Sequence, residues 1–184
     1  QVVFDGDIAR FLAHETIVFG GVADLLEQQR ARLSPLEQEV MFWLAVEREP
    51  VTPEVLSSDL VQRPSPQALL EALHDLRRRS LVESTHAGFT LQTVVLEYFI
   101  GALIAQMAAE ISTDATALLQ RFALLKATAK SYVRESQRNL ILAPIGERVV
   151  EHMGRVELKE QFSVLLSHLR RTQFPDAQMH NALP

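Results

Sequence analysis

The chain has 184 residues, of which 47% are hydrophobic and 22% are charged, as in one large or two small globular domains. Its 18 Lys and Arg against 23 Asp and Glu give a net charge of −5, which argues against a dedicated binder of nucleic acid or anionic membranes. It has no cysteine, so disulfide scaffolds and Cys-based zinc sites are excluded. Because Gln1 is neither Met nor the start of a signal peptide, we expect a fragment of a cytoplasmic protein.

Residues 1–32 are predicted to form an N-terminal helical connector. Short helical patterns lie on both sides of Gly20-Gly21. A glycine pair can cradle a phosphate at a helix N-terminus, but no P-loop spacing surrounds this one. We therefore interpret the pair as a turn or a helix C-cap.

Three hydroxyl–proline pairs mark the next helix starts: Ser34-Pro35, Thr52-Pro53 and Ser65-Pro66. A hydroxyl at the N-cap satisfies a free backbone N–H, and Pro suits the first helical position. Helices are predicted from Pro35 to before Pro50, over about 53–60, and over about 66–79. Glu37 is spaced to complete a capping box with Ser34.

After the third helix, the spacing of the apolar residues changes from that of a helix to that of a strand. Residues 81–84 and 89–91 flank the turn-forming segment 85–88, which contains Gly88, so a β-hairpin is predicted. Three capped helices followed by a hairpin is the order of a winged helix, which we place at residues 33–92. The overall fold class is thus mainly α, with an all-α helical module after the winged helix.

The all-α module is predicted over residues 93–171. Thr93 is expected to cap a long helix that breaks at Ser112-Thr113-Asp114. This helix contains Glu97, Gln106 and Glu110, so we interpret it as a buried amphipathic helix and expect no membrane contact. A second long helical pattern runs from Leu118 to Leu140 and is interrupted by Pro144 and Gly146. Shorter helices are predicted over about 147–153 and 156–170, with a linker at 172–184.

Motifs for catalysis or metal binding were not found. The six histidines, at positions 14, 74, 86, 152, 168 and 180, form no metal-ligand pair. The sequence also lacks a P-loop and a nucleophile elbow. We therefore expect neither an enzyme nor a cofactor or metal site within this chain itself.

The third predicted helix would read DNA if the winged helix bound it. A helical projection puts Leu69, Leu73 and Leu76 inward. The outward face then consists of Gln67, Glu71, His74, Asp75 and Arg78, so it carries more acidic than basic side chains. Nucleic acid is therefore not the expected partner. A winged-helix DNA-binding transcriptional regulator with a helical dimerisation or effector domain stays as the alternative.

Residues 33–51, LSPLEQEVMFWLAVEREPV, resemble the winged-helix segment of bacterial NB-ARC signalling NTPases of the STAND class, many of which carry C-terminal WD repeats. The resemblance extends over about residues 4–145. It includes Leu69-Leu70-Glu71-Ala72-Leu73, Leu76-Arg77-Arg78-Arg79-Ser80-Leu81, Phe89-Thr90-Leu91-Gln92 and Tyr132-Val133-Arg134-Glu135-Ser136-Gln137.

This resemblance implies a regulatory segment of a nucleotide-switched signal-transduction ATPase. An upstream P-loop lobe would bind ADP or ATP with Mg²⁺, and the winged helix would close over ADP in the resting state. A downstream repeat domain would sense the signal, and activation would allow homo-oligomerisation.

The family often has a Met-His-Asp triplet whose His contacts the ADP phosphate. The matching positions here are Leu91, Gln92 and Thr93, so His is replaced by Gln and Asp by Thr. Apart from the resemblance, the N-terminus of the helix that Thr93 is predicted to cap suits a phosphate, and the Gln92 amide beside it can donate. Gln92 and Thr93 are therefore the candidate nucleotide-binding residues, and the alternative for Gln92 is an exposed polar residue without a ligand.

Overall fold

The computed structural model describes residues 21–113 and 117–154. The glycine turn at Gly20, the helix predicted at 156–170 and the linker at 172–184 lie outside the described residues. The chain divides into two compact units, Gln1–Phe99 and Ile100–Pro184, and each is considered by itself.

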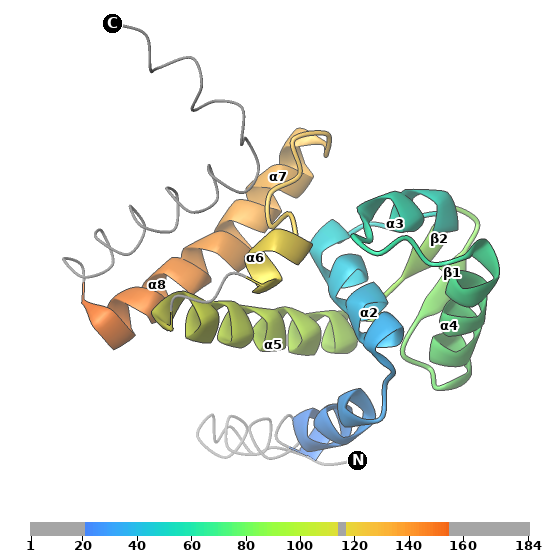
Figure 1. The fold of residues 1–184 in the computed structure, drawn as a ribbon, viewed down its shortest axis with the longest axis horizontal. Coiled ribbons are helices and arrows are strands. Elements are labelled where there is room, and N and C mark those ends of the chain that lie inside the picture. Colours follow the sequence, from blue (N-terminus) through green and yellow to red (C-terminus); the bar gives the residue numbers. More distant parts are fainter. Residues whose placement is uncertain (1–20, 114–116, 155–184) are drawn as a thin grey trace, which may run out of the picture. The chain divides into compact units, whose positions relative to one another are not determined.

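The first unit contains a helical segment at residues 21–31, three further helices and a hairpin (Figure 1). Its elements are α2 (Pro35–Glu47), α3 (Pro53–Asp59), α4 (Pro66–Arg78), β1 (Glu83–Thr85), β2 (Gly88–Thr90) and the first turns of α5 (Thr93–Ser112). The strands are antiparallel, with Ser84 opposite Phe89. The three helices and the hairpin were all predicted in this order.

The caps predicted from the three hydroxyl–proline pairs are all confirmed. Ser34 Oγ accepts from the Glu37 N–H at 3.2 Å, and Glu37 Oε2 accepts from the Ser34 N–H at 2.7 Å, which completes the capping box. Thr52 and Ser65 accept from backbone N–H groups three residues later, at 3.5 and 3.2 Å. Each helix then begins with Pro, whose missing N–H has no acceptor to lose at this position.

The core of this unit forms around α2 and α4. Residues 40–46 of α2 are all buried, as expected for a central helix that is apolar over a wide arc. Leu69, Leu73 and Leu76 of α4 are each at most 2% exposed, so the predicted inward face is confirmed. Apolar burial of this kind is the main source of the unit's stability.

A third extended segment joins the hairpin, and the sequence did not predict it. Val51, between α2 and α3, exchanges two backbone hydrogen bonds with Phe89 of β2, at 2.9 and 2.8 Å. The bridge covers the free edge of β2 and ties the hairpin to the connection between the first two helices.

The described part of the second unit is helical, as predicted for the module after the hairpin. It contains the rest of α5, then α6 (Ala117–Arg121), α7 (Ser131–Gln137), a π-helical turn η1 (Arg138–Leu142) and α8 (Ala143–Met153). The end of α5 at Ser112 confirms the predicted break.

The prediction of one long helix from Leu118 to Leu140 is wrong. Its apolar period is divided between α6, a loop at residues 122–130, and α7. Phe122 and Leu124 lie in this loop, and their side chains are buried, with 4% and 7% exposure. The side chain of Gln137 fixes the loop, because its Oε1 accepts from the Lys126 N–H at 3.1 Å.

Pro144 and Gly146 were predicted to interrupt the helix, and this is also wrong. Pro144 lies in the first turn of α8, where a missing N–H is tolerated. The π-helical turn before it joins α7 to α8 without a break, and the Ala143 N–H donates to the Arg138 carbonyl, five residues back. The helix predicted at 147–153 thus begins earlier, at Ala143.

Within the described part of the chain, one helix, α5, is long and apolar enough to cross a membrane by length and composition alone, with a mean hydropathy of 1.6. Its buried side chains form an apolar stripe along one side of the helix: Val95, Phe99, Ile100, Leu103, Ile104, Met107, Ala108 and Ile111. Glu97, Gln106 and Glu110 lie between them. An apolar stripe with interspersed carboxylates is typical of a core helix.

Candidate functional site

The predicted site residues, Gln92 and Thr93, lie in the connection between β2 and α5. β2 ends at Thr90 and α5 begins at Thr93, so both residues are at a strand–helix junction as predicted. Leu91 is 7% exposed and anchors the junction in the core, whereas Gln92 and Thr93 are exposed.

Gln92, rather than Thr93, is the N-cap residue of α5. The Gln92 carbonyl accepts from the Leu96 N–H at 2.8 Å, which is the first hydrogen bond of α5. Thr93 is therefore the first residue inside the helix, and its predicted capping role is corrected. The N–H groups at the start of a helix have no acceptor within the helix, so those of residues 93–95 are available to an anion.

The Gln92 side chain is turned to the hairpin. Its Nε2 donates to Glu83 Oε1 at 2.8 Å, from the junction to strand β1. The sequence interpretation missed this bond, since it considered only neighbours in the chain. A phosphate at this junction would have to compete with the Glu83 carboxylate for the Gln92 amide and would be repelled by its charge.

The outward face of α4 has the mixed character that the projection predicted. Gln67 Nε2 donates to Glu71 Oε1 at 2.9 Å, within the helix surface. Together with Leu70, His74 and Asp75, these residues line an open hollow of about 570 Å³. The hollow carries two carboxylates, so it does not attract a nucleic-acid backbone.

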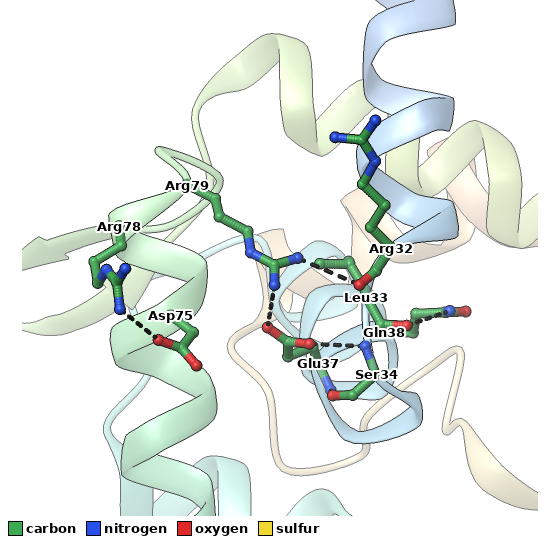
Figure 2. Close-up of polar contacts among 8 residues, drawn as sticks. All are labelled: Arg32, Leu33, Ser34, Glu37, Gln38, Asp75, Arg78 and Arg79. Atoms are coloured by element: carbon green, nitrogen blue, oxygen red, sulfur yellow. Dashed lines mark hydrogen bonds and ion pairs between the residues drawn. The ribbon is translucent and has the colours of Figure 1, made fainter.

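Two of the three basic residues at the end of α4, Arg78 and Arg79, form contacts within the unit (Figure 2). Arg78 pairs with Asp75 at 3.4 Å, one helical turn earlier. Arg79 reaches α2, where its guanidinium lies 3.8 Å from Glu37 Oε1 and also donates to the Arg32 carbonyl at 3.4 Å. The helix dipole favours basic residues at this end of a helix, and a buried capping glutamate such as Glu37 also needs a cation nearby.

A further polar cluster, also missed from the sequence, joins residues 21–31 to α5. The Tyr98 hydroxyl donates to Glu27 Oε2, Arg30 Nη2 donates to Glu27 Oε1 at 2.6 Å, and Arg30 Nε lies 3.2 Å from the Tyr98 oxygen. The hydrogen bond from Arg30, followed by that from Tyr98, lowers the pKa of Glu27. Burial, then the bond to Glu27, raises the pKa of Tyr98.

No metal site is found among the described residues, where no three His, Asp or Glu side chains converge. Three of the histidines, His74, His86 and His152, are in this part of the chain, and all three are exposed.

The chain is 38% identical over 204 aligned residues to a WD repeat-containing protein of Nostoc sp. strain PCC 7120, described as uncharacterized. The match covers 91% of this chain but only 16% of that protein. The chain thus spans about a sixth of its relative's length. No protein-family profile matches the chain, and no solved structure matches it.

Proposed function

We propose that this chain is the winged-helix and adjoining helical segment of a nucleotide-switched signalling ATPase of the STAND class. An NB-ARC nucleotide-binding lobe would precede the segment and WD repeats would follow it, in a cytoplasmic protein. The segment itself regulates and does not catalyse.

The observation that carries the proposal is the arrangement of α2, α3, α4 and the β1–β2 hairpin. A winged helix is expected to have three helices, a hairpin directly after the last of them, and one more extended segment beside the hairpin. Here that segment is bridged to the hairpin at Val51 and Phe89. The WD repeats of the Nostoc relative support the proposed place of the segment in a repeat-containing protein. Repeat domains offer extended binding surfaces, so a protein partner is the proposed signal.

In the proposed resting state, the start of α5 faces the phosphates of ADP. The backbone N–H groups of residues 93–95 supply the contact, because the Gln92 amide already donates to Glu83. ATP in place of ADP would release the winged helix from the nucleotide and expose surfaces for homo-oligomerisation. The site residues remain Gln92 and Thr93, but the expected contact is through the main chain.

The test uses the longer protein that contains this segment. We expect it to purify with about one ADP per chain, detected by chromatography of the denatured protein. Exchange for ATP with Mg²⁺ is expected to raise the mass measured by light scattering. A variant without the phosphate-loop lysine of the proposed upstream lobe is the control. Purified protein without nucleotide, and of constant mass in ADP and ATP, would contradict the proposal.

The alternative function is a DNA-binding regulator that uses α4. The exposed Glu71 and the Arg78–Asp75 pair argue against it, because they reduce the positive charge that a recognition helix offers to phosphates. Gel shifts with selected and random duplexes at physiological salt are expected to show no specific complex. A selected sequence bound at nanomolar affinity would establish this alternative instead.

A further inference from the structure

The second unit contains a basic segment that the overall charge of the chain conceals. Residues 121–138 include five cations, Arg121, Lys126, Lys130, Arg134 and Arg138, and one carboxylate, Glu135. The segment thus has a net charge of +4 in a chain whose net charge is −5. A local excess of this kind concentrates anions even on an acidic protein.

Part of this segment forms a polar hollow of about 330 Å³. Its walls are Leu125 of the loop and Ser131, Arg134, Glu135 and Arg138 of α7 and η1. This volume is at the lower end of the range for small-molecule sites.

The walls of the hollow are held by buried contacts. Gln137 is 0% exposed, and its hydrogen bond to the Lys126 N–H fixes the loop next to the helix. Val133 and Ile141 are buried on the inner face of α7 and η1. The side chains that line the hollow are therefore presented by a fixed backbone, which lowers the entropy cost of binding.

Among the described residues, neither Arg134 nor Arg138 has an ion pair, although Glu135 lines the same hollow. In the first unit, by contrast, Arg30, Arg78 and Arg79 each lie within 4 Å of a carboxylate. Like charges four residues apart on a helix repel each other. An anion between the two guanidinium groups would remove that repulsion.

We propose that this hollow is a binding site for a phosphate group, either free or part of a nucleotide. Guanidinium groups match phosphate oxygens bidentately, and the Ser131 hydroxyl supplies a further donor. Leu125, 41% exposed, offers an apolar wall to whatever carries the phosphate. Glu135 keeps the affinity moderate. The site is formed by residues other than Gln92 and Thr93 and does not depend on the proposed switch.

The test is isothermal titration of the 184-residue chain with pyrophosphate and with ADP, without Mg²⁺, at low and at physiological ionic strength. We expect binding at low ionic strength, with a dissociation constant between about 0.1 and 1 mM that rises with salt. Arg134→Gln and Arg138→Gln should each weaken binding about three- to tenfold. Glu135→Gln should strengthen it, a change that a misfolded variant would not produce.

The matched control is Arg148→Gln, which removes one exposed cation of α8 that does not line the hollow. It should leave the affinity within about twofold, because screening limits distant charges. Tighter binding of ADP than of pyrophosphate, lost in Leu125→Ser, would identify a nucleotide as the source of the phosphate; equal affinities would identify a free phosphate. Equal losses in all three arginine variants, binding of an acidic peptide or RNA in preference to both probes, or no binding to the wild type would overturn the proposal.

Discussion

Gly88 lies directly against the carbonyl group of Val51, so closely that a Cβ atom at Gly88 would be 2.3 Å from the Val51 oxygen. The φ angle of Gly88 is also +131°, a conformation that side chains rarely adopt. Both constraints arise because Gly88 belongs to the hairpin turn and also lies next to the Val51–Phe89 bridge. This contact connects β2 to the start of α3 and so fixes the hairpin on the three helices.

The first prediction is that Gly88→Ala destabilises the chain by at least about 2 kcal/mol, since it combines a backbone clash with an unfavourable φ. The measurement is urea unfolding followed by the fluorescence of Trp43, which is buried in α2. The control is Gly146→Ala in α8, where a Cβ meets no atom within 4 Å. It should stabilise the helix by up to about 1 kcal/mol in far-UV circular dichroism. A Gly88→Ala variant as stable as the wild type would show that the bridge does not form.

A second prediction concerns the start of α2. Ser34→Ala should cost about 1 kcal/mol, the usual value of a capping hydroxyl. Thr52→Ala should cost less, because the Thr52 hydroxyl lies 3.5 Å from its N–H donor and the bond is weak. Thermal unfolding of both variants gives the comparison. An equal or smaller loss for Ser34→Ala would contradict the capping box as a stabilising element.

Glu37 in this capping box should matter more than Ser34. It is only 6% exposed, it accepts a hydrogen bond from the Ser34 N–H, and it forms an ion pair with Arg79 at 3.8 Å. Glu37→Gln should therefore cost about 1–3 kcal/mol, because a neutral amide cannot compensate the cation. The same change at exposed Glu71 is the control and should alter stability by less than about 0.5 kcal/mol.

The Glu27–Tyr98 contact predicts a dependence of stability on acid pH. Because folding lowers the pKa of Glu27, the contribution of this carboxylate is present above its unfolded pKa of about 4.5 and is lost as the pH falls through the lower folded pKa. Tyr98→Phe removes one of the two bonds that lower this pKa. As the pH falls below 4.5, the free energy of unfolding should therefore decrease less for the variant than for the wild type.

The expected difference is less than about 1 kcal/mol, because Glu27 is largely exposed and its charge is screened. Unfolding curves of both proteins at pH 3, 4 and 7 provide the measurement. Tyr132→Phe is the control, since the Tyr132 hydroxyl lies beside Lys130. A wild type and a Tyr98→Phe variant with parallel pH profiles would argue against the contact.

The proposed nucleotide contact predicts a larger effect at Glu83 than at Gln92. In the longer protein, Glu83→Gln should slow ADP release about three- to tenfold, since it removes a negative charge near the phosphates. Gln92→Leu should change the rate by less than about threefold, because its amide is already bonded to Glu83. Gln92→His should slow release more at pH 6 than at pH 8, where the imidazole is neutral.

Release of a fluorescent ADP analogue after mixing with excess unlabelled ADP gives these rates. Glu147→Gln, on the exposed surface of α8, is the control for a change of net charge. The same rate in the wild type and in all the Glu83 and Gln92 variants would show that the hairpin–helix junction does not touch the nucleotide.

The sequence by itself determined the elements whose signals are local. Ser34, Thr52 and Ser65 marked three helix starts because a cap bonds to an N–H only three residues away. The spacing of Leu69, Leu73 and Leu76 gave the buried face of α4, because a helix places such residues on one side. The spacing of apolar residues predicted a wrong element only after Leu118. Apolar residues that are buried in a loop can follow the same spacing as those on one face of a helix.

The tertiary structure alone decided the contacts between residues distant along the chain. The Val51–Phe89 bridge, the Glu37–Arg79 pair and the Glu27–Tyr98 bond depend on how helices and strands approach one another. Chain neighbours carry no signal of that approach, because folding selects it by burying the apolar faces together. The orientation of Gln92 was decided in the same way: its position at the start of α5 was readable, but its amide turned to Glu83 because the hairpin brought the carboxylate there.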